Sequence, residues 1–252
     1  MKIGIIIQAR LASTRLPSKV LLPFSGDKTI LEIIIERLQK SLFNIPICVA
    51  TTVSEVDEPI VEFCQKHDVK FYRGDEFNVL NRFIRAAEQN YFDKIIRVCS
   101  DNPFLSLSLI DNLIEAFKSK YPDSDYLSYK VGNTPALKSH IGIFAELVSL
   151  EALRKAAKLT SDPFYLEHVT NFIYENDELF KVNFIKSAHF SRPDEVRFTI
   201  DTPDDFSLAS KLFEKTPLTD NKDVDIEKLK KLSLFDVKVQ SIMQKQIAIN
   251  SK

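Results

Sequence analysis

The stretch IGIIIQARLASTRLPSK, residues 3–19, decides the fold of this chain. Its opening residues are almost all apolar, which is typical of a strand buried on both faces of a parallel sheet. The loop that follows carries the cations Arg10, Arg15 and Lys19 beside the small residues Ser13 and Thr14. Guanidinium groups match phosphate oxygens, and small side chains leave backbone N–H groups close to a ligand. Because open α/β sheets bind ligands at the carboxyl ends of their strands, this stretch predicts a triphosphate site.

Length and composition narrow the class of protein. The chain has 252 residues and a net charge of −1, so its basic groups are local, and we expect no nucleic-acid partner. No apolar run reaches membrane-spanning length, and the first strand leaves no room for a signal peptide, so we expect a cytoplasmic protein without a membrane partner. Three cysteines indicate no disulfide framework, and Cys48 and Cys99 lie in apolar runs typical of a core. No two of the four histidines have the spacing of a zinc site.

Strands and helices alternate through the first half of the chain. Apolar runs predict strands at 45–51, 70–73 and 94–100, and helical spacing predicts helices at 30–38, 54–66 and 77–89. Short links between them indicate a parallel sheet covered on both faces. A last strand is predicted at 197–200, followed by helices from Pro203 to about Lys215 and from Asp225 to Leu234.

Two carboxylates stand at predicted strand tips. Asp101 follows the strand at 94–100, where it can hold Mg²⁺ against phosphate oxygens. Asp201 precedes a helix in which Thr202, Pro203 and Asp205 have ordinary capping roles, so Asp201 has no structural explanation of its own. We predict that Asp101 and Asp201 meet across one cation.

The motif Ile7-Gln8-Ala9-Arg10-x-x-Ser13-Thr14-Arg15-Leu16-Pro17-x-Lys19-x-Leu21 resembles the signature of the CMP-sugar synthetases, and most closely their spore-coat polysaccharide branch. Further similar motifs lie at residues 74–82, 100–103, 165–170 and 197–205. The resemblance implies a nucleotide-diphosphosugar-transferase-like (Rossmann-like) α/β fold in three layers, with a mixed, mostly parallel sheet. Several motifs in the right order are harder to obtain by chance than one.

The resemblance also implies roles for individual residues. The nucleotide-binding residues would be Gln8, Ala9, Arg10, Ser13, Arg15, Lys19, Arg82 and Ser100. The metal would be Mg²⁺ on Asp101 and Asp201, and these two act in catalysis with Arg10 and Lys19. The acceptor would contact Asn102, His140, Glu167 and His168, of which His140 lies in a segment similar to the sugar-contacting strand of the Kdo cytidylyltransferases.

The chain is expected to form a single domain over residues 1–252. Residues 121–195, where the alternation of strand and helix loosens, would supply the acceptor-binding and dimerisation part, with a strand predicted at 141–147. Residues 237–252 form a polar, partly helical tail that packs on a partner subunit or frays. The resemblance implies a homodimer.

The expected activity is transfer of a cytidylyl group from CTP to an acidic sugar or related acceptor, with release of pyrophosphate, in surface polysaccharide or glycan biosynthesis. One alternative is a nucleotidyltransferase that uses another NTP, or a glycosyltransferase of the same fold. A second is a catalytically lapsed binding or scaffold relative, because Ala12, Ser18 and Asn81 depart from the family pattern. Three cations in the first loop favour the handling of a free triphosphate over the glycosyltransferase.

Overall fold

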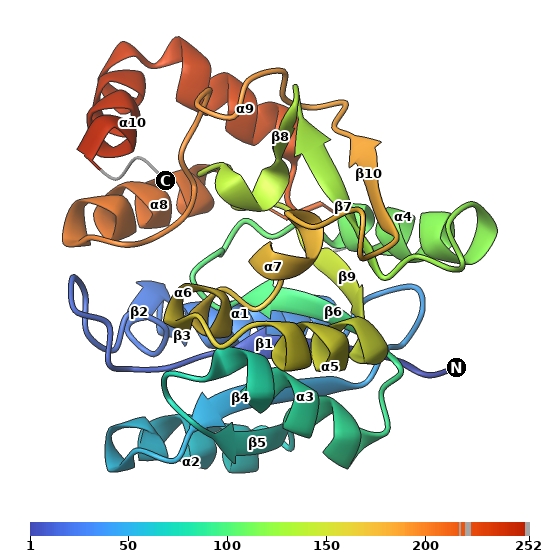
Figure 1. Ribbon diagram of the computed structural model, residues 1–252. Coiled ribbons are helices and arrows are strands. Elements are labelled where there is room, and N and C mark those ends of the chain that lie inside the picture. Colours follow the sequence, from blue (N-terminus) through green and yellow to red (C-terminus); the bar gives the residue numbers. More distant parts are fainter. Residues whose placement is uncertain (217, 220–222, 250–252) are drawn as a thin grey trace.

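The structure is a computed structural model that describes residues 1–216, 218–219 and 223–249. Figure 1 shows a central sheet between two layers of helices. The strands are β1 (Ile3–Gln8), β2 (Pro23–Ser25), β3 (Lys28–Thr29), β4 (Ile47–Thr52), β5 (Lys70–Gly74), β6 (Lys94–Cys99), β7 (Tyr126–Val131), β8 (Thr134–Pro135), β9 (Glu146–Ser149) and β10 (Val182–Lys186). The helices are α1 (Ile30–Leu38), α2 (Glu58–Lys66), α3 (Val79–Asn90), α4 (Leu107–Ser119), α5 (Leu150–Leu159), α6 (Pro163–Glu167), α7 (Asn171–Tyr174), α8 (Pro203–Lys215), α9 (Ile226–Phe235) and α10 (Val237–Ile249), with 3-10 turns η1 (Glu55–Asp57) and η2 (Ala136–Lys138).

The sheet is mixed and mostly parallel, which confirms the predicted fold class. Its strand order is β10-β7-β9-β6-β1-β4-β5, with β8 paired to β7. Strand β1 pairs in parallel with both β4 and β6, whereas β9 runs antiparallel between β6 and β7. The carboxyl ends of β1, β4, β5 and β6 therefore meet at one edge of the sheet, toward which the loops after these strands converge (Figure 1).

Alternation of side chains along β1 divides the core into two layers. Ile5 and Ile7 pack into the cluster that includes residues of α1, α2, α4, α8 and α9. Ile6 points to the other face, into the cluster that includes residues of α3, α5 and α7. All three side chains are fully buried, so β1 has no solvent-facing side between its ends. This is why the sequence of the strand reads as a continuous apolar run.

The helices begin where local capping chemistry directs them. Thr202 accepts a hydrogen bond from the backbone N–H of Asp205, whose own carboxylate accepts from the backbone N–H of Thr202, so α8 begins with a complete capping box. Pro203 occupies the first turn, and the helix ends at Lys215, as predicted. Helix α3 begins at Val79, two residues later than expected, because the side chain of Asn78 caps it by accepting from Asn81 N–H.

Two expectations for the second half of the chain were wrong in detail. Residues 197–200 form no strand; instead the backbone N–H groups of Phe198 and Ile200 donate to the carbonyls of His140 and Asp101. The strand expected at 141–147 is displaced to Glu146–Ser149. The tail is helical, as expected, over α10, which contacts α8 and α9 of its own chain, while residues 250–252 lie outside the described part. Its packing on a partner subunit stays a prediction.

The part of the chain that the structure describes holds no helix long and apolar enough to cross a membrane.

Candidate active site

The loop after β1 is anchored from beneath by a buried carboxylate. Asp57, in η1, accepts a hydrogen bond from the backbone N–H of Leu11 at 2.6 Å and another from the hydroxyl of Thr52. Asp57 is only 1% exposed. Ser18 closes the loop by donating its backbone N–H to the carbonyl of Leu11 at 2.9 Å. These bonds fix the backbone, so the loop's cations project from a defined frame.

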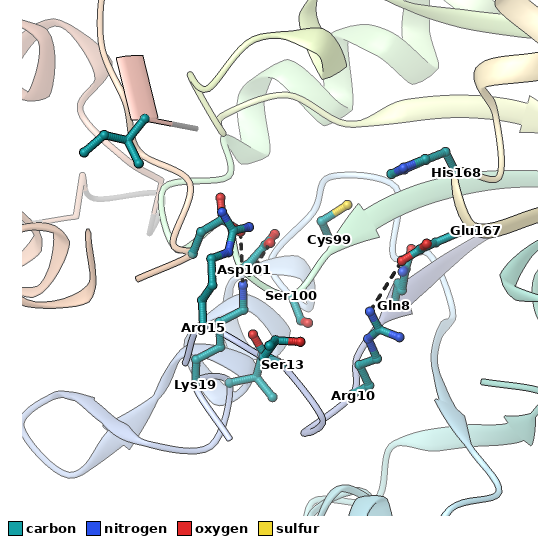
Figure 2. A pocket seen from close by; sticks show the side chains of 14 residues that line it. Gln8, Arg10, Ser13, Arg15, Lys19, Cys99, Ser100, Asp101, Glu167 and His168 are labelled. Atoms are coloured by element: carbon teal, nitrogen blue, oxygen red, sulfur yellow. Dashed lines mark hydrogen bonds and ion pairs between the residues drawn. The ribbon is translucent and has the colours of Figure 1, made fainter. Parts of the chain in front are cut away.

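The loop lines a cavity of about 630 Å³ at the carboxyl edge of the sheet. Residues from β1, the first loop, the end of β6 and the two residues after it, the end of α6 with the residue after it, the segment before α8 and the end of α10 surround it, as the close view in Figure 2 shows for most of them. The lining residues are Gln8, Arg10, Ser13, Thr14, Arg15, Lys19, Val20, Cys99, Ser100, Asp101, Glu167, His168, Asp201 and Ile249. The fold thus brings together the first loop, both predicted strand-tip carboxylates and the predicted acceptor residues Glu167 and His168.

Lys19 joins the two carboxylates that were predicted to meet. Its ammonium Nζ lies 3.2 Å from Oδ2 of Asp101 and 3.8 Å from Oδ1 of Asp201, and it also donates to the backbone carbonyl of Ile200. Arg15 approaches Asp201 from the solvent side, with Nη2 at 2.9 Å from Oδ1. Two carboxylates and two cations therefore share one small region.

Arg10 lies at the opposite side of the cavity, between two glutamates. Its Nη2 is 3.5 Å from Oε1 of Glu167, and its Nη1 is 3.9 Å from Oε1 of Glu76. Figure 2 shows the Arg10–Glu167 pair separated from the Lys19–Asp101 pair, with Ser13 and Ser100 between them. Both Arg10 contacts are long and partly exposed to solvent, so a phosphate can displace them at little cost.

Arg197 holds Asp201 in place, a role that the sequence did not reveal. Its guanidinium donates to Oδ2 of Asp201 at 2.8 Å and to both carboxylate oxygens of Asp205, and it contacts Nδ1 of His140 at 2.5 Å. Burial alone would raise the pKa of Asp205, but the hydrogen bonds and charge of Arg197 lower it overall. Asp201 is therefore oriented by a buried, fully engaged arginine.

A second cavity, of about 510 Å³, adjoins the first. Gln8, Cys99, Asp101 and His168 line both cavities and so mark their junction. The remaining walls of the second cavity come from Arg97, Asn102, Ala136, Leu137, Lys138, Ser139, Gly142, Phe144, Phe164, Asn171, Tyr174, Glu175 and Thr199. Gly142 adopts a φ of +66°, and a Cβ there would lie 3.2 Å from Oδ1 of Asn102, so a side chain at this position would crowd the cavity wall.

Arg97 and Gln8, which line the second cavity, belong to a buried polar network. Arg97 donates to Glu146 at 2.7 Å and to the side-chain oxygen of Gln8 at 3.2 Å. Glu146 is fully buried and also accepts hydrogen bonds from the hydroxyls of Tyr126 and Thr170. Sequence reasoning selected Gln8 but not Arg97, Glu146, Tyr126 or Thr170, although a lone arginine inside the apolar run at 94–99 was the available signal.

Three predicted site residues do not line either cavity. Ala9 is buried in the core at 1% exposure, and Arg82 donates from Nη1 to the backbone carbonyl of Asp75 instead of projecting into the first cavity. Burial and the nearby charge of Arg10 lower the pKa of Arg82 to about 10. His140 is buried beside Arg197, so it supports Asp201 through that arginine. Cys99, predicted to be a core residue, instead lines both cavities.

The donor set at Asp101 and Asp201 fits a magnesium ion. Their carboxylates approach the same ammonium group of Lys19 to within 4 Å, and Mg²⁺ commonly binds one or two carboxylates together with substrate phosphates and water. Among the described residues, no group of three or more His, Cys, Asp or Glu side chains converges as a full protein cage would require. Two carboxylates that line the first cavity match the sparser magnesium pattern.

Comparison of the sequence with known proteins identifies two relatives over most of the chain. An uncharacterized protein of Methanocaldococcus jannaschii is 42% identical over 213 residues, which is 84% of this chain and 83% of the relative. The spore coat polysaccharide biosynthesis protein SpsF of Bacillus subtilis is 33% identical over 215 residues, covering 83% of this chain and 85% of the relative. The second match confirms the resemblance to the spore-coat branch.

Solved structures of similar fold lead to the same group. A cytidylyltransferase from Leptospira borgpetersenii has a TM-score of 0.82 and 30% identity, with 98% of each chain covered. A CMP:2-keto-3-deoxy-manno-octonic acid (Kdo) synthetase solved with CTP has a TM-score of 0.62 at 17% identity, covering 85% of this chain and 99% of that one, and so shares the fold. The sequence pattern of the cytidylyltransferases matches residues 4–239. This protein therefore belongs to the cytidylyltransferase family.

Proposed function

We propose that this protein transfers the cytidylyl group of CTP to a hydroxyl of an acidic sugar or a related acceptor and releases pyrophosphate, as a step in surface polysaccharide or glycan biosynthesis. The observation that carries the proposal is the junction of two cavities at Gln8, Cys99, Asp101 and His168. A nucleotide in one cavity and an acceptor in the other would be held close enough to react, which is the main task of a catalyst for this transfer.

The first cavity supports the triphosphate half of the proposal. One loop lines it with the cations Arg10, Arg15 and Lys19. Each cation is paired with a carboxylate, and phosphate oxygens could replace these carboxylates as its partners. In the reaction, these cations would neutralise charge on the departing pyrophosphate. Membership of the family and the CTP bound in the related Kdo synthetase structure support CTP as the donor.

Asp101 and Asp201 would hold Mg²⁺. The ion, when bound, would neutralise charge on the phosphate oxygens and so favour attack at the α-phosphorus. Arg197 would keep Asp201 oriented, because its guanidinium bonds Asp201 and Asp205 together. Lys19, freed from the carboxylates, would then face the phosphates.

The second cavity supports a polar, acidic acceptor. Arg97 and Lys138 supply two cations to its walls, and Lys138 is paired with Glu175 at 2.6 Å in a partly exposed bridge that an acceptor carboxylate can replace. Oδ1 of Asn102 and Oγ1 of Thr199 are buried there without a hydrogen-bond partner. Unmet polar atoms of this kind favour a ligand that carries hydroxyl groups.

The proposal also includes a cytoplasmic location and a homodimer. Sedimentation analysis would test the homodimer.

A thermal-shift screen of the four NTPs, with and without Mg²⁺, tests the donor. A ligand that binds only the folded state stabilises it by about 2.7 kcal/mol at one hundred times its dissociation constant, so CTP with Mg²⁺ is expected to raise the midpoint selectively. Pyrophosphate release with a panel of sugar acids and polyols then tests the acceptor. A screen in which no NTP shifts the midpoint would contradict the proposal and favour a relative that consumes a sugar nucleotide or serves as a scaffold.

A further inference from the structure

The junction of the two cavities contains one side chain suited to accept a proton near neutral pH. Gln8 has no group that titrates, and Asp101 is paired with Lys19 and is a proposed magnesium ligand. Thiols such as Cys99 as a class lose their protons above neutral pH, whereas imidazoles exchange theirs close to it. His168 is therefore the junction residue whose chemistry fits proton transfer.

The backbone around His168 is rigid although its side chain is exposed. Its N–H donates to the carbonyl of Phe164 at 2.9 Å, and its carbonyl accepts from the N–H of Asn171 at 2.8 Å. The next two residues, Val169 and Thr170, are fully buried, and the Thr170 hydroxyl donates to the buried Glu146. Because these contacts fix the backbone, the exposed side chain of His168 lines the two cavities from a fixed position.

The imidazole itself has a neighbour that limits its motion. The ring of Phe164, which lines the second cavity, packs against it with centroids 4.6 Å apart. Figure 2 shows His168 extending over the cavity on the side of Glu167 and Cys99, away from the Lys19–Asp101 pair. The ring is thus presented from the acceptor side, while the phosphate-binding cations and the proposed metal ligands lie across the cavity.

We propose that His168 is the general base of the transfer, an inference that rests on the proposed function. The acceptor hydroxyl gives its proton to an imidazole nitrogen as its oxygen forms a bond to the α-phosphorus of CTP. The bond from that phosphorus to the oxygen bridging to the β-phosphate breaks, and pyrophosphate leaves with the electron pair. The imidazolium returns its proton to water after the products depart.

The electrostatic surroundings suit a base that becomes charged during the reaction. The titratable and charged groups that line the two cavities with His168 are Arg10, Arg15, Lys19, Arg97, Cys99, Asp101, Lys138, Glu167, Tyr174, Glu175 and Asp201. Each of the five cations already has a carboxylate partner, with contacts at 2.6–3.5 Å. Because carboxylates pair with these cations, the cations repel the imidazolium that forms less than unpaired cations would.

The test is the pH dependence of turnover in His168→Gln, measured as pyrophosphate release from CTP and Mg²⁺ with the acceptor found most active for the unaltered protein. The substitution is expected to lower kcat by about a hundredfold. The fall in rate that the unaltered protein shows toward acid, where imidazoles gain a proton, should disappear. In His168→Ala, added imidazole should restore part of the rate. Calorimetry should give unchanged CTP affinity in both variants.

His67 provides a matched control, because it also stacks on a phenylalanine, Phe63, but lies at the end of α2 away from both cavities. His67→Gln should keep the rate and pH profile of the unaltered protein. If His168→Gln keeps the acid limb of the profile, or imidazole gives no rescue, His168 is not the base. If the unaltered protein binds no CTP in calorimetry, the proposed function itself fails, and the role of His168 fails with it.

Discussion

The guanidinium of Arg10 lies 3.5 Å from the carboxylate of Glu167, so the loop after β1 and the end of α6 are joined across the first cavity. Under the proposed function, a phosphate that binds Arg10 must displace Glu167, so the pair would compete with CTP. Exposed ion pairs are worth about 0.2–1 kcal/mol, so Glu167→Gln should tighten CTP binding by up to about fivefold in calorimetry. Glu178→Gln, at an exposed position on another segment, is the control. Weaker CTP binding by Glu167→Gln would mean that this carboxylate helps to bind the substrate.

Asp101 is expected to be indispensable for turnover. Its carboxylate approaches the ammonium of Lys19 to 3.2 Å at the junction of the two cavities, and it is one of two proposed magnesium ligands. Asp101→Ala should abolish pyrophosphate release while leaving the thermal midpoint nearly unchanged, because the side chain is partly exposed. Asp123→Ala, which removes an exposed carboxylate elsewhere, should retain full activity. Normal turnover by Asp101→Ala would remove the metal role.

Ser18 holds a backbone conformation that favours glycine. Its φ is +59°, a conformation that costs an L residue about 1–2 kcal/mol and that glycine adopts freely. Replacing serine by glycine relieves this strain, but it also makes the unfolded chain more flexible, which lowers the free energy of unfolding by about 0.5–1 kcal/mol. Ser18→Gly should therefore stabilise the protein by up to about 1 kcal/mol in denaturant unfolding. Ala12, in the same loop, has no positive φ, so Ala12→Gly should not stabilise. Equal effects of the two substitutions would contradict this account.

Asp223 links stability to pH. Burial alone would raise its pKa, but the backbone N–H groups of Ser108 and Leu107 donate to it and lower the pKa overall. A carboxyl whose pKa is lower in the folded state stabilises fully above its unfolded pKa, near 3.9, and loses this contribution as the pH falls toward the folded value. The free energy of unfolding should thus decline below about pH 4.

Asp223→Asn tests that assignment. Asp223 also receives a hydrogen bond from the buried Arg37 at 3.0 Å, so its neutralisation should cost about 3–5 kcal/mol at neutral pH. The variant should also lose stability less steeply in acid, as followed by urea unfolding at several pH values. An unchanged acid slope would assign the pH dependence to other carboxyls, such as Asp205.

The cysteines should differ sharply in reactivity. Burial raises the pKa of Cys48 and of Cys64 to about 12, so both should resist a thiol reagent in the folded protein. Cys99 is partly exposed and lines both cavities, so it should be modified alone, and CTP with Mg²⁺ should protect it. Mass spectrometry after brief labelling measures all three. Modification of Cys99 at the same rate with bound nucleotide would place the nucleotide elsewhere.

The sequence predicted those features that local chemistry determines. The apolar run of β1, the cationic loop after it and the capping box of α8 each depend on neighbouring residues, and the structure confirms all three. The parallel pairing of β1 and β6 also places Asp101 at the edge of the sheet where the loop after β1 lies, because the carboxyl ends of parallel strands meet at one edge.

Features that depend on distant partners were beyond sequence reasoning. Arg82 and His140 carry the right chemistry, but the fold directs one toward the carbonyl of Asp75 and the other toward Arg197. The buried pair of Arg97 and Glu146 joins β6 to the antiparallel β9, whose pairing no local pattern indicated. Residues 197–200 have a strand-like sequence, but their backbone N–H groups donate to isolated carbonyls of His140 and Asp101 and they form no strand.

The buried pair of Arg97 and Glu146 marks a part of the protein whose sequence cannot change easily, in contrast to the segments outside it. Glu146 receives hydrogen bonds from β6, β7 and the residue that begins α7, and Arg97 passes the connection to Gln8 at the tip of β1. Losing either charge would leave the other buried and unpaired. Residues 136–144 and the segment 163–168 lie outside this hydrogen-bonded network and supply much of the second cavity's wall. Under the proposed function, descendants of this protein could acquire new acceptors by exchanging those two segments, while the scaffold that would align the nucleotide stays intact.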